Sequence, residues 1–275
     1  MRPTVKKPKR LCSAVRSHHF LYQLPEELQR RLIATKSTTY TSAYLDQVNK
    51  TSLTLDSDAK RKKQLLILDL NGTLLSRTNR RGGMYVRPHL DSFLDYIFTH
   101  FRVMVWSSAQ KTSVKHMMKF FTAQQISQMV LTWDRSNFGL SKKDFNNKAA
   151  TIKDLNKVWQ KKGLHYFDAS NTVILDDSPS KCVLQPFNSI HLPTFDHRDP
   201  QFLQHGDQAL LSVMEYLERI ERQTNIPNFV RKVPFSWTIP LKSNSVDRMS
   251  RYYSFKGVDE PLECDFAVPQ PTSRI

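Results

Sequence analysis

A continuous apolar run that stops at an aspartate most constrains what this chain can fold into. Residues Leu65–Leu68 are all aliphatic, and Asp69 follows them directly. An unbroken run of this kind is typical of a strand buried on both faces, and such strands occur mainly in parallel sheets. We therefore expect a parallel sheet with Asp69 at the carboxyl end of one strand.

Apolar strand patterns and amphipathic helix patterns alternate through the middle of the chain. Further strands are predicted at 102–106, 129–133, 172–175 and 189–192, and helices at 90–99, 112–121, 149–160 and 201–222. This alternation predicts an α/β domain with a doubly wound parallel sheet flanked by helices. Ligands of such sheets bind beyond the carboxyl ends of the strands.

We divide the chain into three segments. Residues 1–60 form a basic N-terminal arm with a short helix predicted at 24–34 and an irregular stretch after it. Residues 61–222 form the α/β domain, and residues 223–275 form a proline-containing extension. We expect this extension to be an extended tail that packs only in part, through Phe235 and Trp237.

The formal net charge of +16 favours acidic partners, such as nucleic acid, an anionic membrane or a phosphorylated peptide. A basic tail and a solvated surface would give the same charge, so both interpretations stay open. No nucleic-acid-binding motif accompanies the charge, and we place direct nucleic-acid binding below the other functions. No apolar run reaches the roughly 18 residues of a membrane span.

The cysteines indicate no special chemistry. Cys12, Cys182 and Cys264 are scattered and odd in number, which predicts neither a disulfide framework nor a zinc site. The basic cluster at 6–10 is of the nuclear-localisation type, so we expect a nuclear or cytoplasmic protein. A mitochondrial presequence is the alternative, although Pro3 and Pro8 would interrupt its helix.

Polar residues follow three of the predicted strands. The first strand ends at Asp69, the second at Ser107 and Ser108, and the third at Asp176 and Asp177. Carboxylates from two strands that meet at one edge would repel each other unless a cation lay between them. Hard oxygen ligands beside an open position indicate Mg²⁺.

Five short segments in chain order carry a family resemblance. The segment at 69–74 (DLNGTL) resembles the DxDxT motif of haloacid-dehalogenase superfamily phosphatases. Together with the other four, it resembles the RNA-polymerase-II C-terminal-domain phosphatase homology family, also called NLI-interacting-factor-like. The others are 85–88 (YVRP), 105–109 (VWSSA), 152–155 (IKDL) and 174–179 (ILDDSP). The resemblance covers about 64–222 and implies a haloacid-dehalogenase-like Rossmannoid fold.

The resemblance also implies an active site. Asp69 would attack phosphorus and form an aspartyl-phosphate, with Mg²⁺ held by Asp69, the backbone carbonyl of Asn71 and a side chain of the Asp176–Asp177 pair.

Three further residues of the motifs take roles by the same resemblance. Ser107 would donate a hydrogen bond to a phosphoryl oxygen, and Lys153 would neutralise the phosphate and hold Asp69. Thr73 would shape the turn after the first strand.

Substrate contacts are predicted at Arg87, Ser108 and Arg135. For the two arginines the alternative, that they only line the protein surface, is equally open. About 30 residues after the second strand are too few for a large cap domain, and the polar segment 136–147 fits a short insertion beside the cleft. A site with little or no cap suits a phosphorylated or acidic protein segment better than a small metabolite. We expect a monomer.

Position 71 departs from the family pattern. The family carries a second aspartate there, which protonates the leaving oxygen and later activates water, whereas this chain has Asn71. An amide cannot transfer that proton at neutral pH. Two hypotheses therefore stay open: a slow protein serine/threonine phosphatase, and a pseudophosphatase that binds a partner, as in the mitochondrial presequence-translocase receptor branch of the family.

Overall fold

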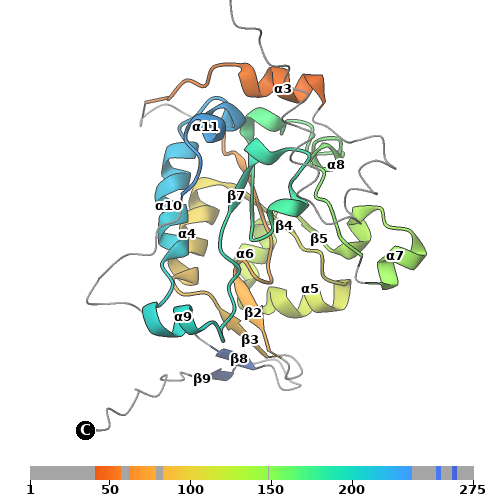
Figure 1. The fold of residues 1–275 in the computed structure, drawn as a ribbon, viewed down its shortest axis with the longest axis vertical. Helices are drawn as coiled ribbons and strands as arrows, with labels where there is room; N and C mark the ends of the chain where they lie inside the picture. Colours follow the sequence, from red (N-terminus) through yellow and green to blue (C-terminus); the bar gives the residue numbers. More distant parts are fainter. Residues whose placement is uncertain are drawn as a thin grey trace, which may run out of the picture.

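The computed structural model describes residues 41–56, 62–78, 83–147 and 149–236, together with the backbone of two later strands. Its main sheet is parallel, with five strands in the order β5-β4-β1-β6-β7 (Figure 1). These strands are β1 (Leu65–Leu68), β4 (Arg102–Trp106), β5 (Leu131–Trp133), β6 (Thr172–Asp176) and β7 (Ser189–His191). The predicted α/β class with a parallel sheet is confirmed.

The central strand β1 is buried on both faces, as its unbroken apolar run predicts. Leu66 and Leu68 enter one hydrophobic cluster, and Leu65 and Ile67 enter another on the opposite face. This alternation follows from the two-residue period of a strand. The sheet therefore lies between two cores, and β1 contributes to both.

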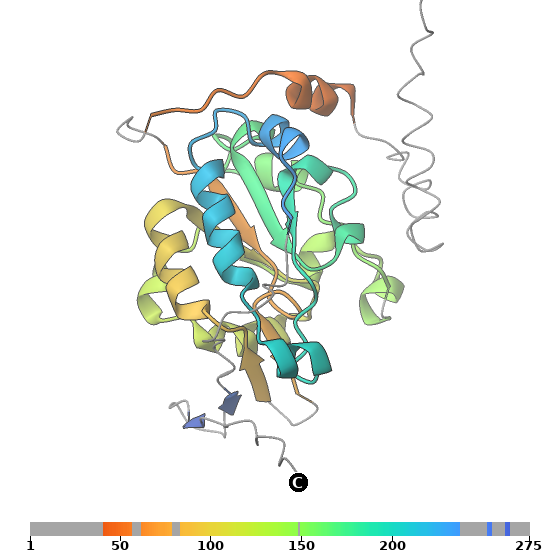
Figure 2. The same ribbon diagram turned by 60° about the vertical axis from the view of Figure 1, so that its left-hand side comes forward.

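Two long helices cover one face of the sheet. Helices α4 (Leu90–His100) and α10 (Ala209–Ile220) pack against each other there (Figure 2). In α10 the buried residues recur at helical spacing, with Leu210, Val213 and Leu217 on one side. The other face is covered by α8 (Asn156–Trp159) and by the irregular segments around it.

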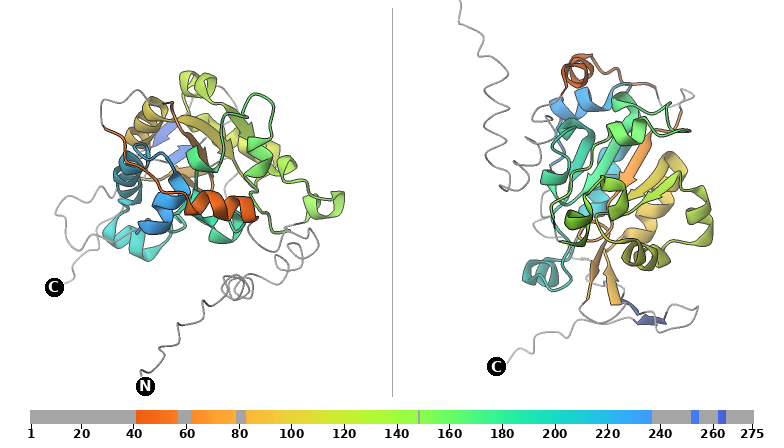
Figure 3. Two further views of the ribbon diagram at one scale, coloured as in Figure 1. Left: turned by 90° about the horizontal axis from the view of Figure 1, so that it is seen from above. Right: turned by 90° about the vertical axis from the view of Figure 1, so that its right-hand side faces the viewer.

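A hairpin lies beyond the carboxyl end of β1. Strands β2 (Leu75–Arg77) and β3 (Gly83–Val86) pair antiparallel and continue into a second sheet with β8 (Tyr252–Ser254) and β9 (Leu262–Cys264). The hairpin extends away from the main sheet (Figure 3, right). We did not predict it, because its strands are only three and four residues long.

A helix pair lies at the opposite end of the sheet. Helix α3 (Ser42–Asn49) packs on α11 (Ile226–Lys232), and Asn228 Nδ2 donates to the carbonyl of Val48 at 2.8 Å. We predicted an irregular segment at 35–60 and an extended tail after 223, and both predictions were wrong here. Each helix is stabilised by its contact with the other. Because the two segments lie far apart in the sequence, neither segment alone predicts this contact.

Several predicted elements are shorter or divided. The helix predicted at 149–160 is reduced to α8, and the helix predicted at 201–222 is split because Gly206 has a positive φ of 75°. The remaining elements are α5 (Lys111–Met117), α6 (Ala123–Gln128), α7 (Lys142–Asn146) and α9 (Pro200–His205), with 3₁₀ turns at Met118–Phe120, Arg135–Phe138, Ala169–Asn171, Pro179–Lys181 and Pro186–Asn188.

Phe235 packs against Tyr216, with 5.3 Å between ring centroids, as we expected of the C-terminal extension. The helix predicted at 24–34, the basic cluster at 6–10 and Trp237 lie outside the described residues. Within the described part of the chain, every helix is too short or too polar to cross a lipid bilayer.

Candidate active site

Three carboxylates converge at the carboxyl edge of the main sheet. Asp69 follows β1, Asp176 ends β6 and Asp177 comes next, and the two strands are in register with Leu68 beside Leu175. One carboxylate oxygen from each aspartate lies within 4.8 Å of the others. Asp69 and Asp176 are buried, with 1% and 0% of their surface exposed. The sequence predicted this convergence from the strand ends alone.

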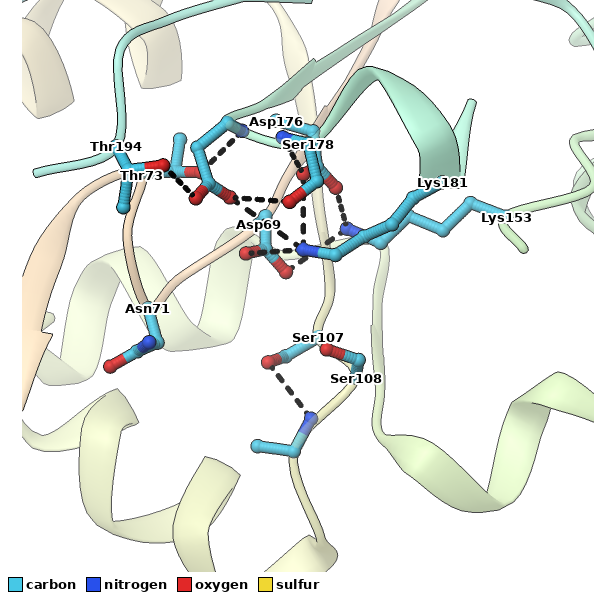
Figure 4. A network of polar contacts seen from close by, with 12 residues as sticks. Asp69, Asn71, Thr73, Ser107, Ser108, Lys153, Asp176, Ser178, Lys181 and Thr194 are labelled. Carbon is cyan, nitrogen blue, oxygen red and sulfur yellow. Dashed lines mark hydrogen bonds and ion pairs between the residues drawn. The ribbon is translucent and has the colours of Figure 1, made fainter. Parts of the chain in front are cut away.

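Lys153 joins two of these carboxylates (Figure 4). Its Nζ donates to Asp69 Oδ1 at 3.0 Å and to Asp176 Oδ2 at 2.5 Å, and its side chain is fully buried. The residue lies in the segment before α8 that forms neither helix nor strand, and not inside the predicted helix. The structure therefore brings Lys153 to the predicted site by a different local conformation from the one we expected.

Lys181 is a second cation at the site, and we did not predict it. Its Nζ lies 3.1 Å from Asp176 Oδ1, 3.5 Å from Asp69 Oδ2 and 3.6 Å from Asp177 Oδ1. It ends the 3₁₀ turn that begins at Pro179. Its position four residues after Asp177 is the one sequence signal that points to it, because that spacing brings two side chains together within a helical turn.

Burial and the two lysines act in opposite directions on the pKa values of Asp69 and Asp176. Burial acts to raise the pKa of Asp176, but Lys153 and Lys181 outweigh burial and lower it to about 2. Burial acts to lower the pKa of Lys153, but the carboxylates of Asp176 and Asp69 outweigh burial and raise this pKa. For Asp69 burial prevails, and its pKa is raised. Asp176 is thus the firmly ionised carboxylate, whereas burial opposes ionisation of Asp69.

The loop after β1 positions Asp177. Gly72 has a φ of +88°, which favours glycine, and a Cβ atom there would lie 2.5 Å from Asp177 Oδ2, so any other residue would displace that carboxylate. The backbone N–H of Asp177 donates to Thr73 Oγ1 at 3.0 Å, and Thr194 Oγ1 donates to Asp177 Oδ2 at 2.8 Å. Thr73 therefore contacts Asp177 directly, and so does Thr194, a neighbour that the sequence did not single out.

Ser107 and Ser108 follow β4, the strand next to β1. Ser107 is buried, and its Oγ accepts a hydrogen bond of 3.3 Å from the backbone N–H of Ala109, which fixes the turn after the strand. Figure 4 draws both serines beside the carboxylate cluster. The structure thus places them at the same sheet edge as Asp69.

Asn71 has its side chain turned away from Asp69 (Figure 4). Its Oδ1 accepts hydrogen bonds from Arg77 Nε at 3.0 Å and from the Arg77 backbone N–H at 3.4 Å. The amide oxygen is therefore bound to Arg77, the last residue of β2, and not to the nucleophile.

Arg87 is buried among the loops at the sheet edge, within electrostatic range of Asp177. Its side chain is buried, pairs with Asp207 at 2.9 Å and donates to the carbonyls of Thr73 at 2.9 Å and Pro193 at 3.0 Å. These contacts tie three loops together. The guanidinium group is committed to internal acceptors, so its placement does not support the predicted contact with substrate.

Arg135 is also directed inward. It is 8% exposed, and its guanidinium group donates to backbone carbonyls of Phe145, Asp144, Asn147 and Ala149. The side chain thereby organises the polar insertion at 136–147. Its placement, like that of Arg87, indicates a structural role, and its contact with substrate stays a prediction.

Residues 64–227 match the family described as NLI interacting factor-like phosphatases. An uncharacterized FCP1 homology domain-containing protein of Schizosaccharomyces pombe is 30% identical over 83% of this chain and 97% of its own length. The mitochondrial import inner membrane translocase subunit TIM50 of Phytophthora infestans is 26% identical over 60% of this chain and 36% of its own length.

Among solved structures, the fission yeast RNA polymerase II CTD phosphatase Fcp1 bound to beryllium fluoride matches with 17% identity and a TM-score of 0.40. This match covers 58% of the present chain and 52% of the solved one. The chain thus spans about half the length of that enzyme.

Proposed function

The chain belongs to the family of NLI interacting factor-like phosphatases, and on that premise we propose that it is a Mg²⁺-dependent protein serine/threonine phosphatase. The observation that carries the proposal is the buried ion cluster in which Lys153 joins Asp69 to Asp176. A carboxylate held by lysine side chains at the edge of a parallel sheet is well placed to act as a nucleophile.

The residues present fit Mg²⁺. Asp69, Asp176 and Asp177 offer hard oxygen donors within 4.8 Å of one another, which is the ligand type that this ion prefers. Gly72 keeps the space beside Asp177 clear of a side chain. These carboxylates, with the backbone carbonyl of Asn71, would hold the ion. When bound, Mg²⁺ offsets negative charge on both nucleophile and phosphate.

In the proposed reaction, a carboxylate oxygen of Asp69 attacks phosphorus. The new oxygen–phosphorus bond forms as the bond to the serine or threonine oxygen breaks, which gives an aspartyl-phosphate. Lys153 holds Asp69 in place and neutralises charge on the phosphoryl group, and Ser107 donates a hydrogen bond to a phosphoryl oxygen. Water then attacks phosphorus, releases inorganic phosphate and regenerates the carboxylate.

Proton transfer is the weak step. The departing alkoxide needs a proton, and the attacking water must lose one. Asn71 can do neither, because an amide does not ionise at neutral pH. Loss of general acid–base catalysis typically costs about 10²–10⁴ in rate. We therefore expect slow turnover of alkyl phosphates and faster turnover of aryl phosphates, whose leaving groups need less help.

A binding module without turnover is the second candidate, and the contact between Asn71 and Arg77 favours it. The site keeps its ion cluster but directs the residue at position 71 away from the nucleophile. Such a pseudophosphatase would hold a phosphorylated or acidic protein segment, which the net charge of +16 suits. The similarity to a translocase subunit fits a role in binding proteins.

One experiment separates these candidates. Purified protein with Mg²⁺ should hydrolyse an aryl phosphate, and Asp69→Asn should remove that activity. Binding of a phosphoserine peptide should be measured on both proteins by calorimetry, against the same peptide without phosphate. Hydrolysis no faster than the Asp69→Asn background would exclude the enzyme, and phosphate-dependent binding in that case would establish the binding module.

We propose a nuclear or cytoplasmic location, with the mitochondrion as the alternative. The basic cluster at 6–10 supports the nuclear assignment. Fluorescence microscopy of the full chain with a C-terminal tag, compared with a variant in which the five residues are alanine, tests it. Nuclear signal that depends on the cluster supports the assignment, and mitochondrial signal overturns it.

A further inference from the structure

Lys181 contacts the same three carboxylates that would hold Mg²⁺. Its Nζ lies 3.1 to 3.6 Å from one oxygen each of Asp176, Asp69 and Asp177. Figure 4 shows its side chain entering the cluster alongside that of Lys153. Lys153 contacts two of the three carboxylates, so among the described residues Lys181 is the cation in contact with the complete set.

Two backbone hydrogen bonds fix the position of the Lys181 main chain. Its N–H donates to the carbonyl of Ser178 at 3.0 Å, and its own carbonyl accepts from the N–H of Lys153 at 2.7 Å. Pro179 starts the short turn that ends at Lys181. The side chain is 17% exposed, in contrast to a solvated surface lysine. Its position is therefore built into the turn after β6.

Charge and size make this ammonium group a rival of the metal. With the aspartates ionised, the three carboxylates carry three negative charges and the two lysines two positive ones, so the cluster is already largely neutralised. Mg²⁺ requires oxygen ligands at about 2.0–2.1 Å. An ammonium group among the same oxygens leaves no room for such an ion, and the two cations would repel each other.

We propose that Lys181 is a tethered cation that competes with Mg²⁺ for Asp69, Asp176 and Asp177 and so sets the metal affinity of the site. The inference rests on the proposed Mg²⁺ site. Mg²⁺ enters only as the flexible lysine side chain leaves the cluster. The protein accordingly holds its carboxylates together without metal and binds Mg²⁺ weakly.

Calorimetric titration with Mg²⁺ tests the competition directly. Lys181→Met removes the charge and keeps an unbranched side chain, and Lys162→Met removes an exposed lysine as the matched control. We expect the Kd for Mg²⁺ to fall at least tenfold in Lys181→Met and to stay within twofold of wild type in Lys162→Met. An unchanged or weaker affinity in Lys181→Met overturns the inference while leaving the Mg²⁺ site intact.

Lack of Mg²⁺ binding by wild type and Lys181→Met alike overturns the Mg²⁺ site itself, and the inference with it. Circular dichroism shows whether Lys181→Met is folded. If that variant is not folded, the accessibility of Lys181 is measured in the wild-type protein by lysine acylation and mass spectrometry. Saturating Mg²⁺ should raise the labelling of Lys181 several-fold and leave Lys162 unchanged, whereas constant or reduced labelling of Lys181 contradicts the competition.

Discussion

Asn71 Oδ1 accepts a hydrogen bond of 3.0 Å from Arg77 Nε, so the residue at the proton-transfer position is bound to the hairpin and turned from Asp69. This contact changes what Asn71→Asp should do. An aspartate would supply the missing acid and base, yet Arg77 would attract its carboxylate and stabilise its charged form. The arginine therefore opposes the restored function.

We predict that Asn71→Asp raises kcat for an aryl phosphate by about 10-fold and that Asn71→Asp with Arg77→Gln raises it by about 10²-fold or more. Steady-state kinetics with Mg²⁺ measures both. Arg77→Gln alone is the control, and we expect it to leave kcat near the wild-type value. If neither aspartate variant gains activity, position 71 is not what limits this site.

Sequence patterns predicted those parts of the site that depend on strand ends. The apolar run of β1 places Asp69, and the run of β6 places Asp176 and Asp177, because parallel strands in register bring their carboxyl ends to one edge. The two apolar runs and the aspartates that follow them are visible in the sequence of each strand. The roles of these residues in catalysis remain predictions that the kinetic experiments test.

Other parts depend on contacts between distant segments and could not be predicted in this way. Lys181 reaches the cluster because its carbonyl accepts from the Lys153 N–H, 28 residues earlier in the chain. Arg87 is buried because its partner Asp207 lies 120 residues later. The spacing of Lys181 from Asp177 is a weak signal, and neither basic residue's full set of partners can be read from the sequence, because packing assigns them.

Arg87 provides a stability prediction. Replacing it with leucine leaves the Asp207 carboxylate buried without its counter-charge and leaves the carbonyls of Thr73 and Pro193 without these donors. Removal of one partner of a buried ion pair typically costs about 3–5 kcal/mol. We expect a loss of that size in the free energy of unfolding of Arg87→Leu, measured by urea denaturation.

Arg198→Leu is the matched control, because its pair with Asp196 is largely exposed and should contribute little to stability. One outcome would instead support the substrate contact that the sequence predicted for Arg87. If Arg87→Leu were as stable as Arg198→Leu but raised KM for a phosphopeptide several-fold, then Arg87 would contact substrate and its buried ion pair would matter little.

Gly72 and Gly163 give a paired test of how tightly the loop after β1 is built around Asp177. Both have a φ of +88°, so alanine at each position carries a similar conformational cost of about 1–2 kcal/mol. They differ in their surroundings. A Cβ at Gly72 would lie 2.5 Å from Asp177 Oδ2, whereas a Cβ at Gly163 would meet nothing within 4 Å.

We therefore predict that Gly163→Ala lowers stability by about 1–2 kcal/mol and leaves Mg²⁺ binding unchanged. Gly72→Ala should lower stability further and weaken Mg²⁺ binding at least tenfold, because Asp177 must move out of the carboxylate cluster to make room. Thermal unfolding and calorimetric titration of both variants measure the two effects. Equal effects of the two substitutions on Mg²⁺ affinity would mean that Asp177 is not a ligand, and the ion would then depend on Asp69, Asp176 and the backbone carbonyl of Asn71.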